Sequence, residues 1–118
     1  MDNGKTKQLF ALIPEMEINL SNFSQENSEI AAILLDKFED YFVQCELLIV
    51  FDWSNWITTI QSEIDDSKTD FDNYSFETLC KIGTSIIRGE RFNENLILTY
   101  YLKGVLLKIL KSLEKKLK

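Results

Sequence analysis

The sequence predicts an all-α protein, a single domain over residues 1–118 that folds as a bundle of four to five helices. Its last helix is expected to be long and amphipathic. The chain holds one proline and four glycines among 118 residues, so few residues interrupt helices. In most segments apolar residues recur at spacings of three and four, the period of an α-helix. The length suits one domain with its own core.

The N-terminal part, residues 1–26, has the least regular pattern and is expected to be partly loop. Apolar residues predict a short helix over residues 5–13 that stops near Pro14, because proline disfavours helical geometry in the residue before it. Residues 14–26 are polar and carry Ser21, Asn22 and Ser24, which indicates a loop.

Residues 27–45 predict a long helix that Asn27 or Ser28 caps. Its expected buried face consists of Ile30, Ile33, Leu34, Phe38, Tyr41, Phe42 and Cys45. Residues 46–51 are ambiguous between strand, helix and connector. Their β-branched run has no convincing partner strand, so a buried connector or a helical extension is favoured.

The clearest helix start is at Asp52, whose carboxylate can accept hydrogen bonds from the first turn. Phe51 and Trp56 are spaced for a hydrophobic staple across this start. An acidic loop is expected over residues 63–73, followed by a helix that Ser75 caps and Gly89 ends. The final helix runs from Asn93 or Asn95 to about residue 116, with the apolar stripe Leu98, Tyr101, Leu102, Val105, Leu106, Ile109, Leu110, Leu113 and Leu117.

The charge of the C-terminal segment is opposite to that of the rest of the chain. Residues 103–118 hold six lysines and one glutamate, a net charge of +5, whereas the other 102 residues hold 18 acids and seven bases, a net charge of −11. The basic face is either a solvated helix surface that suits the helix dipole or a weak anionic-surface binder. That face consists of Lys103, Lys108, Lys111, Lys115 and Lys118.

Many kinds of chemistry lack their residues in this sequence. It has no histidine and no glycine-rich phosphate loop, and its two cysteines are 35 residues apart. The acidic loop fails as a calcium loop, because a lysine and a phenylalanine stand where a ligand and a glycine are needed. We expect no enzyme, no catalytic residue, no cofactor and no metal ligand.

The location of the protein is expected to be cytoplasmic. No apolar run approaches the ~20 residues that a membrane helix needs, so no membrane span is predicted. The first residues do not resemble a secretion signal. Cys45 and Cys80 stand among apolar residues and are expected to be reduced thiols.

One group of residues combines both tryptophans with the only two arginines: Asp52, Trp53, Trp56, Arg88, Arg91 and Phe92. Two interpretations are open. In the structural one, Asp52 pairs with Arg88 or Arg91 and a tryptophan stacks nearby, which joins two helix ends. In the functional one, the tryptophans and arginines form a binding surface, because these residue types dominate the energies of interfaces.

The pattern Asp52-Trp53-x-x-Trp56, followed by Arg88-x-x-Arg91-Phe92 and Gly104, resembles a family of small uncharacterised bacterial and phage proteins. The resemblance also includes Thr78-Leu79 and Thr84 and spans roughly residues 40–113. It implies a prokaryotic or mobile-element source and a helical domain, with no assigned activity. The chain departs from the pattern at residues 93–95, where Asn-Glu-Asn replaces an expected glycine.

Together these features favour a non-enzymatic protein-binding module. Its acidic body suits an inhibitor or immunity-type factor that acts on a basic, nucleic-acid-handling protein. The identity of that protein partner is not specified by the sequence. A homodimer is the alternative, since Leu106, Leu110 and Leu117 could cover a second subunit. Direct nucleic-acid binding is not expected, because a body of −11 repels phosphate.

Overall fold

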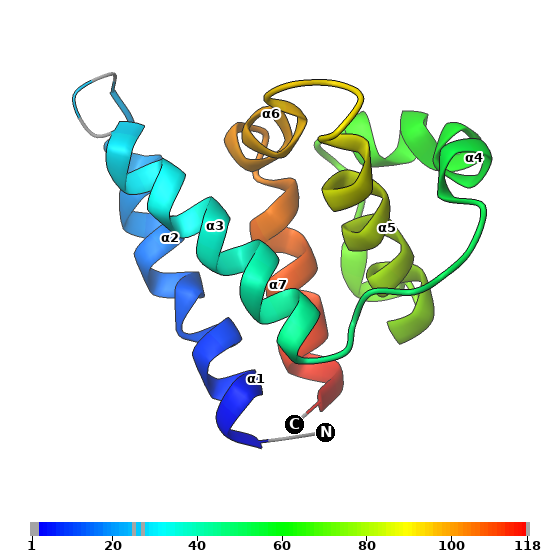
Figure 1. The fold of residues 1–118 in the computed structure, drawn as a ribbon, viewed down its shortest axis with the longest axis horizontal. Coiled ribbons are helices and arrows are strands. Elements are labelled where there is room, and N and C mark those ends of the chain that lie inside the picture. The colour runs from blue at the N-terminus through cyan, green and yellow to red at the C-terminus, as the bar shows by residue number, and fades with distance from the viewer. Residues whose placement is uncertain (1–2, 25, 27, 118) are drawn as a thin grey trace.

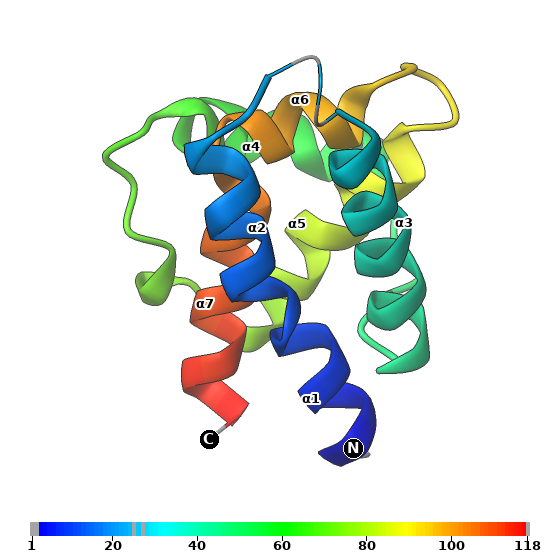
Figure 2. The ribbon, with the colours of Figure 1, turned by 90° about the vertical axis from the view of Figure 1, so that its left-hand side faces the viewer.

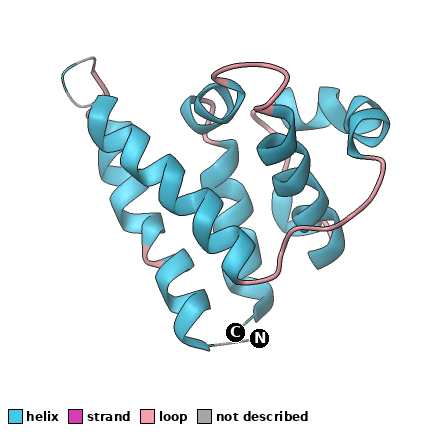
Figure 3. Ribbon diagram, in the orientation of Figure 1, coloured by secondary structure: helices cyan, strands magenta, loops and turns pink. Residues whose placement is uncertain are grey.

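The all-α prediction is confirmed by a computed structural model, which describes residues 3–24, 26 and 28–117. Within these residues the backbone forms helices and connecting loops and contains no strand (Figure 3). The helices outnumber the four to five expected. They are α1 (Asn3–Phe10), α2 (Leu12–Ser21), α3 (Ser28–Gln44), α4 (Trp53–Asp65), α5 (Phe76–Gly89), α6 (Leu96–Leu102) and α7 (Val105–Leu117), with a short 3-10 helix, η2 (Phe71–Asn73).

Helix α7 lies at the centre of the bundle (Figure 1). On one side, α1 and α2 follow each other along the chain and pack against α3, and both also contact α7. On the other side α5 packs against α7, and α4 packs on the outer side of α5. Helix α6 crosses one end of the bundle at a steep angle to α7 (Figure 2).

The N-terminal region is more helical than predicted. Residues 12–21 form α2, although the sequence indicated a loop from residue 14 onwards. Pro14 is the third residue of α2, where a backbone N–H has no intrahelical acceptor, so its missing N–H costs nothing. The buried Asn19 side chain of α2 accepts a hydrogen bond from the Tyr101 hydroxyl (2.6 Å), which ties α2 to α6.

Helix α3 matches the helix predicted over residues 27–45, but its buried face is displaced. Ile30 and Ile33 were expected to be buried, yet they are 52% and 55% exposed, whereas Ala31 is buried. The ring of Phe42 covers Gly83 of α5 so closely that a Cβ at Gly83 would lie 2.5 Å from Phe42 Cζ. The inward side of α3 therefore faces α1 and α2, against which it packs, and its C-terminal part also contacts α5 through Phe42.

The ambiguous segment over residues 46–51 is a connector, as one of the two favoured interpretations held. Leu47 is buried, and the Ile49 N–H donates to the Oγ1 atom of the buried Thr84 (3.1 Å). The segment is only partly covered, because Val50 is 97% exposed.

The prediction of one long C-terminal helix is wrong, because the structure divides this segment into α6 and α7. The break is at Gly104, whose φ of +82° lies in the left-handed region that favours glycine. The division lets α6 cross the end of the bundle while α7 enters the core, where Leu106, Ile109, Leu110 and Leu113 are fully buried. Leu102, expected in the stripe, is instead 46% exposed.

Candidate functional site

Four of the six residues in the predicted cluster line one surface depression of about 340 Å³. These four are Trp53, Arg88, Arg91 and Phe92. The other lining residues, 49–51, belong to the connector. The sequence did not indicate their place here, because this segment was expected to be a buried connector or a helical extension. We call this the aromatic–arginine surface; its lining residues are Ile49, Val50, Phe51, Trp53, Arg88, Arg91 and Phe92.

Three elements meet at the aromatic–arginine surface. Trp53 is the first residue of α4, and Arg88 lies in the last turn of α5. Gly89 allows Leu96 to approach closely, because a Cβ there would lie 2.6 Å from Leu96 Cδ2; Trp53 Cζ3 would lie at 3.7 Å, an ordinary contact distance. Gly89 was predicted only as a helix end, and the structure gives it a packing role as well.

The turn that carries Arg91 and Phe92 is held by the Glu90 carboxylate. Its two oxygens accept hydrogen bonds from the backbone N–H groups of Asn95 (2.8 Å) and Ile97 (2.9 Å) at the start of α6. An acidic group suits this position because the first N–H groups of a helix lack intrahelical acceptors. The Phe92 N–H also donates to the Gly89 carbonyl (3.0 Å), so the surface is held by its own backbone.

Two large apolar side chains of the aromatic–arginine surface face solvent. Phe92 is 81% exposed and Val50 is 97% exposed. Trp53 is half-buried beneath Phe92, with ring centroids 6.0 Å apart and a tilt of 31° between the planes. Exposed apolar groups of this size around a depression are typical of an interaction site.

The predicted ion pair between Asp52 and an arginine is absent. Neither Arg88 nor Arg91 lies within 4.0 Å of a carboxylate oxygen in the part of the chain that the structure describes. Asp52 instead accepts hydrogen bonds from Asn55 Nδ2 (2.7 Å) and Ser54 Oγ (3.4 Å), and its side chain does not cap the backbone of α4. Donors two and three residues away satisfy Asp52 without ordering a long arginine side chain.

Trp56 lies apart from the arginines. It packs edge-to-face on Phe51 (5.7 Å between centroids), which fits the predicted hydrophobic staple. The cation near these two rings is Lys81 of α5, whose Nζ is 5.4 Å from the Phe51 centroid and 5.7 Å from that of Trp56. No sequence signal pointed to Lys81, because the contact joins residues that are 25 positions or more apart.

A second depression of about 310 Å³ lies on the other side of the Glu90 turn, between α3 and α6. Asp36, Glu39 and Glu90 line it, and we call it the acidic groove. Burial raises the pKa of the Glu39 carboxyl, and the nearby charges of Asp40, Asp36 and Glu90 raise it further, while Arg91 opposes them. The charges of the acidic groove and of the aromatic–arginine surface therefore interact, through Glu39 and Arg91.

The predicted basic face is engaged within the molecule. Lys108 Nζ donates to the Ser67 carbonyl (3.0 Å). The Lys115 and Ser112 hydrogen bonds hold the pKa of the Asp72 carboxyl below its usual range. Lys118 lies outside the described residues. The other ion pairs join Lys103 to Asp65 (3.5 Å), Lys111 to Glu17 (3.1 Å) and Lys115 to Asp72 (2.6 Å).

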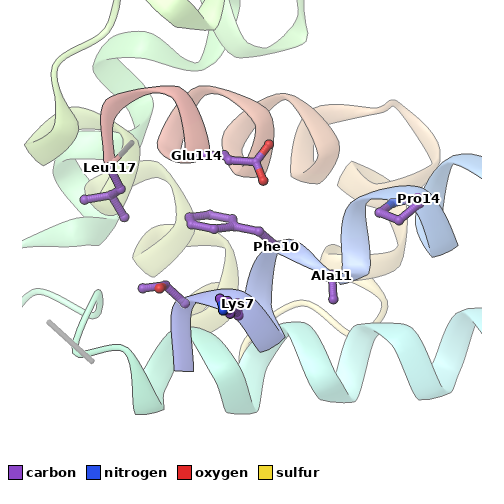
Figure 4. Close-up of a pocket in the computed structure, with 7 residues that line it drawn as sticks. Lys7, Phe10, Ala11, Pro14, Glu114 and Leu117 are labelled. Atoms are coloured by element: carbon purple, nitrogen blue, oxygen red, sulfur yellow. The ribbon is translucent and has the colours of Figure 1, made fainter. Parts of the chain in front are cut away.

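A larger depression, of about 490 Å³, lies between α1, the start of α2 and the end of α7 (Figure 4). The ring of Phe10 points from α1 towards α7 on its floor, and Lys7, Pro14 and Leu117 contribute to its walls. Thr6, Ala11 and Glu114 complete its lining.

The described residues contain no group of three or more histidine, cysteine, aspartate or glutamate side chains placed to hold a metal ion. Cys45 and Cys80 are buried and form no disulfide, as expected. Burial raises the pKa of the Cys80 thiol to about 11, so Cys80 is a protonated core residue at neutral pH. No helix in the described ranges is long and apolar enough to cross a membrane.

The fold and its surfaces define a small all-α protein with a preformed aromatic–arginine surface beside an acidic groove. The chain belongs to a family of unknown function (DUF6508), whose model matches residues 2–118. No curated protein matches the chain, and no solved structure does so either. The match agrees with the expectation of an uncharacterised family.

Proposed function

We propose that the protein is a non-enzymatic protein-binding module that acts through the aromatic–arginine surface. The observation that carries this proposal is the pair of exposed apolar side chains, Phe92 and Val50, beside two arginines that form no ion pair within 4.0 Å with a described acid. Aromatic and arginine side chains supply most of the binding energy at protein interfaces. The proposed site of action is the cytoplasm, which suits two cysteines without a disulfide.

The rigidity of this surface also supports the proposal. Glu90 fixes the turn below Phe92, and α4 and α5 fix Trp53 and Arg88. A surface that is already ordered loses little conformational entropy when a partner binds. The same residues have no nucleophile–base pair among them, so binding is favoured over catalysis.

The experiment is affinity capture from a prokaryotic lysate with four immobilised proteins. They are the unchanged chain, Phe92→Ser, Val50→Ser and, as a matched control, Ile18→Ser. Ile18 is 67% exposed on α2, away from the residues that line the surface, so its substitution removes a similar apolar group elsewhere. The expected result is a saturable protein partner that both surface variants lose and that the control retains.

Two results would contradict the proposal. Either no protein would bind saturably, or a partner would bind the Phe92→Ser and Val50→Ser variants as well as it binds the unchanged chain. Because both side chains are exposed, their substitution should leave folding intact. Circular dichroism during thermal unfolding checks that the variants are folded before the capture is interpreted.

A second candidate function is an acidic inhibitor or immunity-type factor for a basic, nucleic-acid-handling protein. The observation that favours it is the acidic groove, which Asp36, Glu39 and Glu90 line; burial raises the pKa of Glu39, and the charges of Asp40, Asp36 and Glu90 raise it further. Clustered carboxylates attract a basic partner and accelerate association. A phage or bacterial source would fit this function.

The second candidate is tested by neutralising Asp36 and Glu39 together. For a basic partner, Asp36→Asn with Glu39→Gln should slow association several-fold at low salt and have little effect at high salt. Surface plasmon resonance against the captured partner measures this rate. A partner whose association rate is unchanged would remove the acidic groove from the interface.

Homo-oligomerisation through α7 has less support. Of the three residues that were expected to cover a second subunit, Leu106 and Leu110 are fully buried in the same chain, and Leu117 is 37% exposed. The lysines of α7 and of its preceding turn likewise contact acidic or carbonyl groups of the same chain, which leaves few of them for an anionic surface. Light scattering over a wide concentration range tests the oligomeric state directly.

A further inference from the structure

We infer that the aromatic–arginine surface binds a protein segment that presents carboxylates next to a large apolar side chain. The inference rests on the proposed function and adds the chemistry of the partner. This chemistry is the opposite of a basic partner, for which the acidic groove would be needed.

The first argument is the distribution of positive charge. The chain carries a net charge of −6, and several of its lysines are held by its own acids, as in the contacts of Lys103, Lys111 and Lys115. By contrast, Arg88 and Arg91 face the depression with no described carboxylate within 4.0 Å. Glu39 is the described acid that interacts electrostatically with Arg91, but it forms no ion pair with it, so both guanidinium groups can pair with an acid supplied by another molecule.

The second argument is the residue type. These are the only two arginines among 13 basic residues, and both line the same depression. The planar guanidinium group can donate two parallel hydrogen bonds to one carboxylate and is weakly hydrated, so it can be partly buried in an interface. Lysine provides neither property, and every other base of the chain is a lysine.

The third argument is the apolar part of the surface. Phe92 and Val50 are the most exposed apolar residues of the lining, and Trp53, Ile49 and Phe51 form its partly buried apolar part. A partner side chain seated here would contact aromatic and aliphatic groups while its flanking carboxylates met the arginines. Burial of the exposed Phe92 and Val50 would then add apolar contact area.

A phosphate could also pair with the arginines, but the surroundings disfavour nucleic acid. Affinity for a phosphate backbone increases with the number of bases engaged, and this depression contains two. Glu39 interacts electrostatically with Arg91 and also with Asp36 and Asp40, so a polyanion that continued past Arg91 towards Glu39 would be repelled. A short acidic and apolar segment meets less of this repulsion.

The experiment is the selection of a random peptide library, displayed on phage, against the full chain. The expected peptides carry aspartate or glutamate within a few residues of phenylalanine, tryptophan or leucine. Fluorescence anisotropy then measures one synthetic peptide from the selection. Arg88→Gln with Arg91→Gln should weaken its binding at least tenfold, as should replacement of the peptide's acids by amides, whereas the control Lys37→Gln should leave it unchanged.

Several results would overturn the inference. Peptides enriched without acidic residues, or no enrichment, would show that the arginines do not recognise carboxylates. Tighter binding of a single-stranded oligonucleotide than of the peptide would identify phosphate as the ligand. A dimer of the unchanged chain that Phe92→Ser abolishes would identify a second copy as the occupant. The proposed function is tested separately, by whether capture of a partner from the lysate depends on Phe92 and Val50.

Discussion

At Gly83 the absence of a side chain determines how closely α3 approaches α5. The ring of Phe42 occupies the space of a Cβ, with Cζ only 2.5 Å from its ideal position. We predict that Gly83→Ala lowers the free energy of unfolding by about 1–3 kcal/mol, the range for overpacking a core. Urea denaturation of both proteins measures the difference.

A double-mutant cycle isolates the steric cause of this loss. Phe42→Leu alone should destabilise the protein, because it removes part of a fully buried ring. In the Gly83→Ala background the same change should cost less, since the shorter side chain relieves the overlap. Strictly additive losses would show that the two positions do not clash.

The side-chain contacts that the sequence predicts differ in the range over which they act. The cap at Ser75, whose Oγ accepts from the Thr78 N–H (3.1 Å), was predictable because donor and acceptor are neighbours in the chain. The meeting of Trp53 with Phe92 was suggested only by composition, since 39 positions separate them. The pairing of Asp52 with an arginine was wrong because nearby side-chain donors satisfy Asp52 first.

At the scale of elements, Gly104 separates α6 from α7. Its φ of +82° costs a residue with a Cβ roughly 1–2 kcal/mol, although no atom lies within 4 Å of the Cβ position. We predict that Gly104→Ala lowers the free energy of unfolding by about that amount, because the buried Tyr101 and Val105 on either side hold the bend. Thermal or urea unfolding measures the change.

Gly104→Asn is the matched control, since asparagine tolerates the left-handed region better than alanine does. The expected order of stability is glycine, then asparagine, then alanine. An alanine variant as stable as the unchanged chain would mean that α6 and α7 can merge into one helix. Such merging would restore the single long helix that the apolar periodicity predicts.

The elements also show what periodicity can and cannot predict. It located α3, α4, α5 and the apolar stripe of α7, because each turns one apolar face towards the core, although that face is only partly buried in α4. It missed the break at Gly104, since both α6 and α7 continue the same apolar spacing. It missed most of α2 because Pro14 and several polar residues resemble a loop, although the buried Met16 and Asn19 face the core.

At the scale of the molecule, the opposite charges of the C-terminal segment and the body meet within one chain. Lys111 reaches Glu17 of α2, and Lys115 reaches Asp72 of η2, across 94 and 43 positions of sequence. The sequence predicted the contrast in charge but not these ion pairs, because the amphipathic spacing of a helix does not reveal which acids of other elements lie next to its lysines. The lysines of the C-terminal segment therefore stabilise contacts within the chain more than they form a docking surface.

The core also makes the whole molecule sensitive to alkaline pH. Burial raises the pKa of Tyr101 to about 12 from an ordinary 10.0, and burial together with the Glu63 hydrogen bond raises that of Tyr74 to about 12. Burial raises the pKa of Cys80 to about 11 from 9.0. Between these ordinary and raised values the unfolded chain binds fewer protons than the folded one, so stability falls as pH rises.

We therefore predict that the urea midpoint decreases steadily from about pH 9 to about pH 12, while it is nearly constant from about pH 7 to pH 8. Each deprotonation also adds negative charge to a chain whose net charge is already −6, which increases repulsion in the folded state. Tyr74→Phe removes one of the three groups and should make the decline shallower above about pH 10. A midpoint that does not change between about pH 8 and pH 11.5 would show that these groups ionise without opposing the fold, and therefore that the buried phenol and thiol are not held protonated by the core.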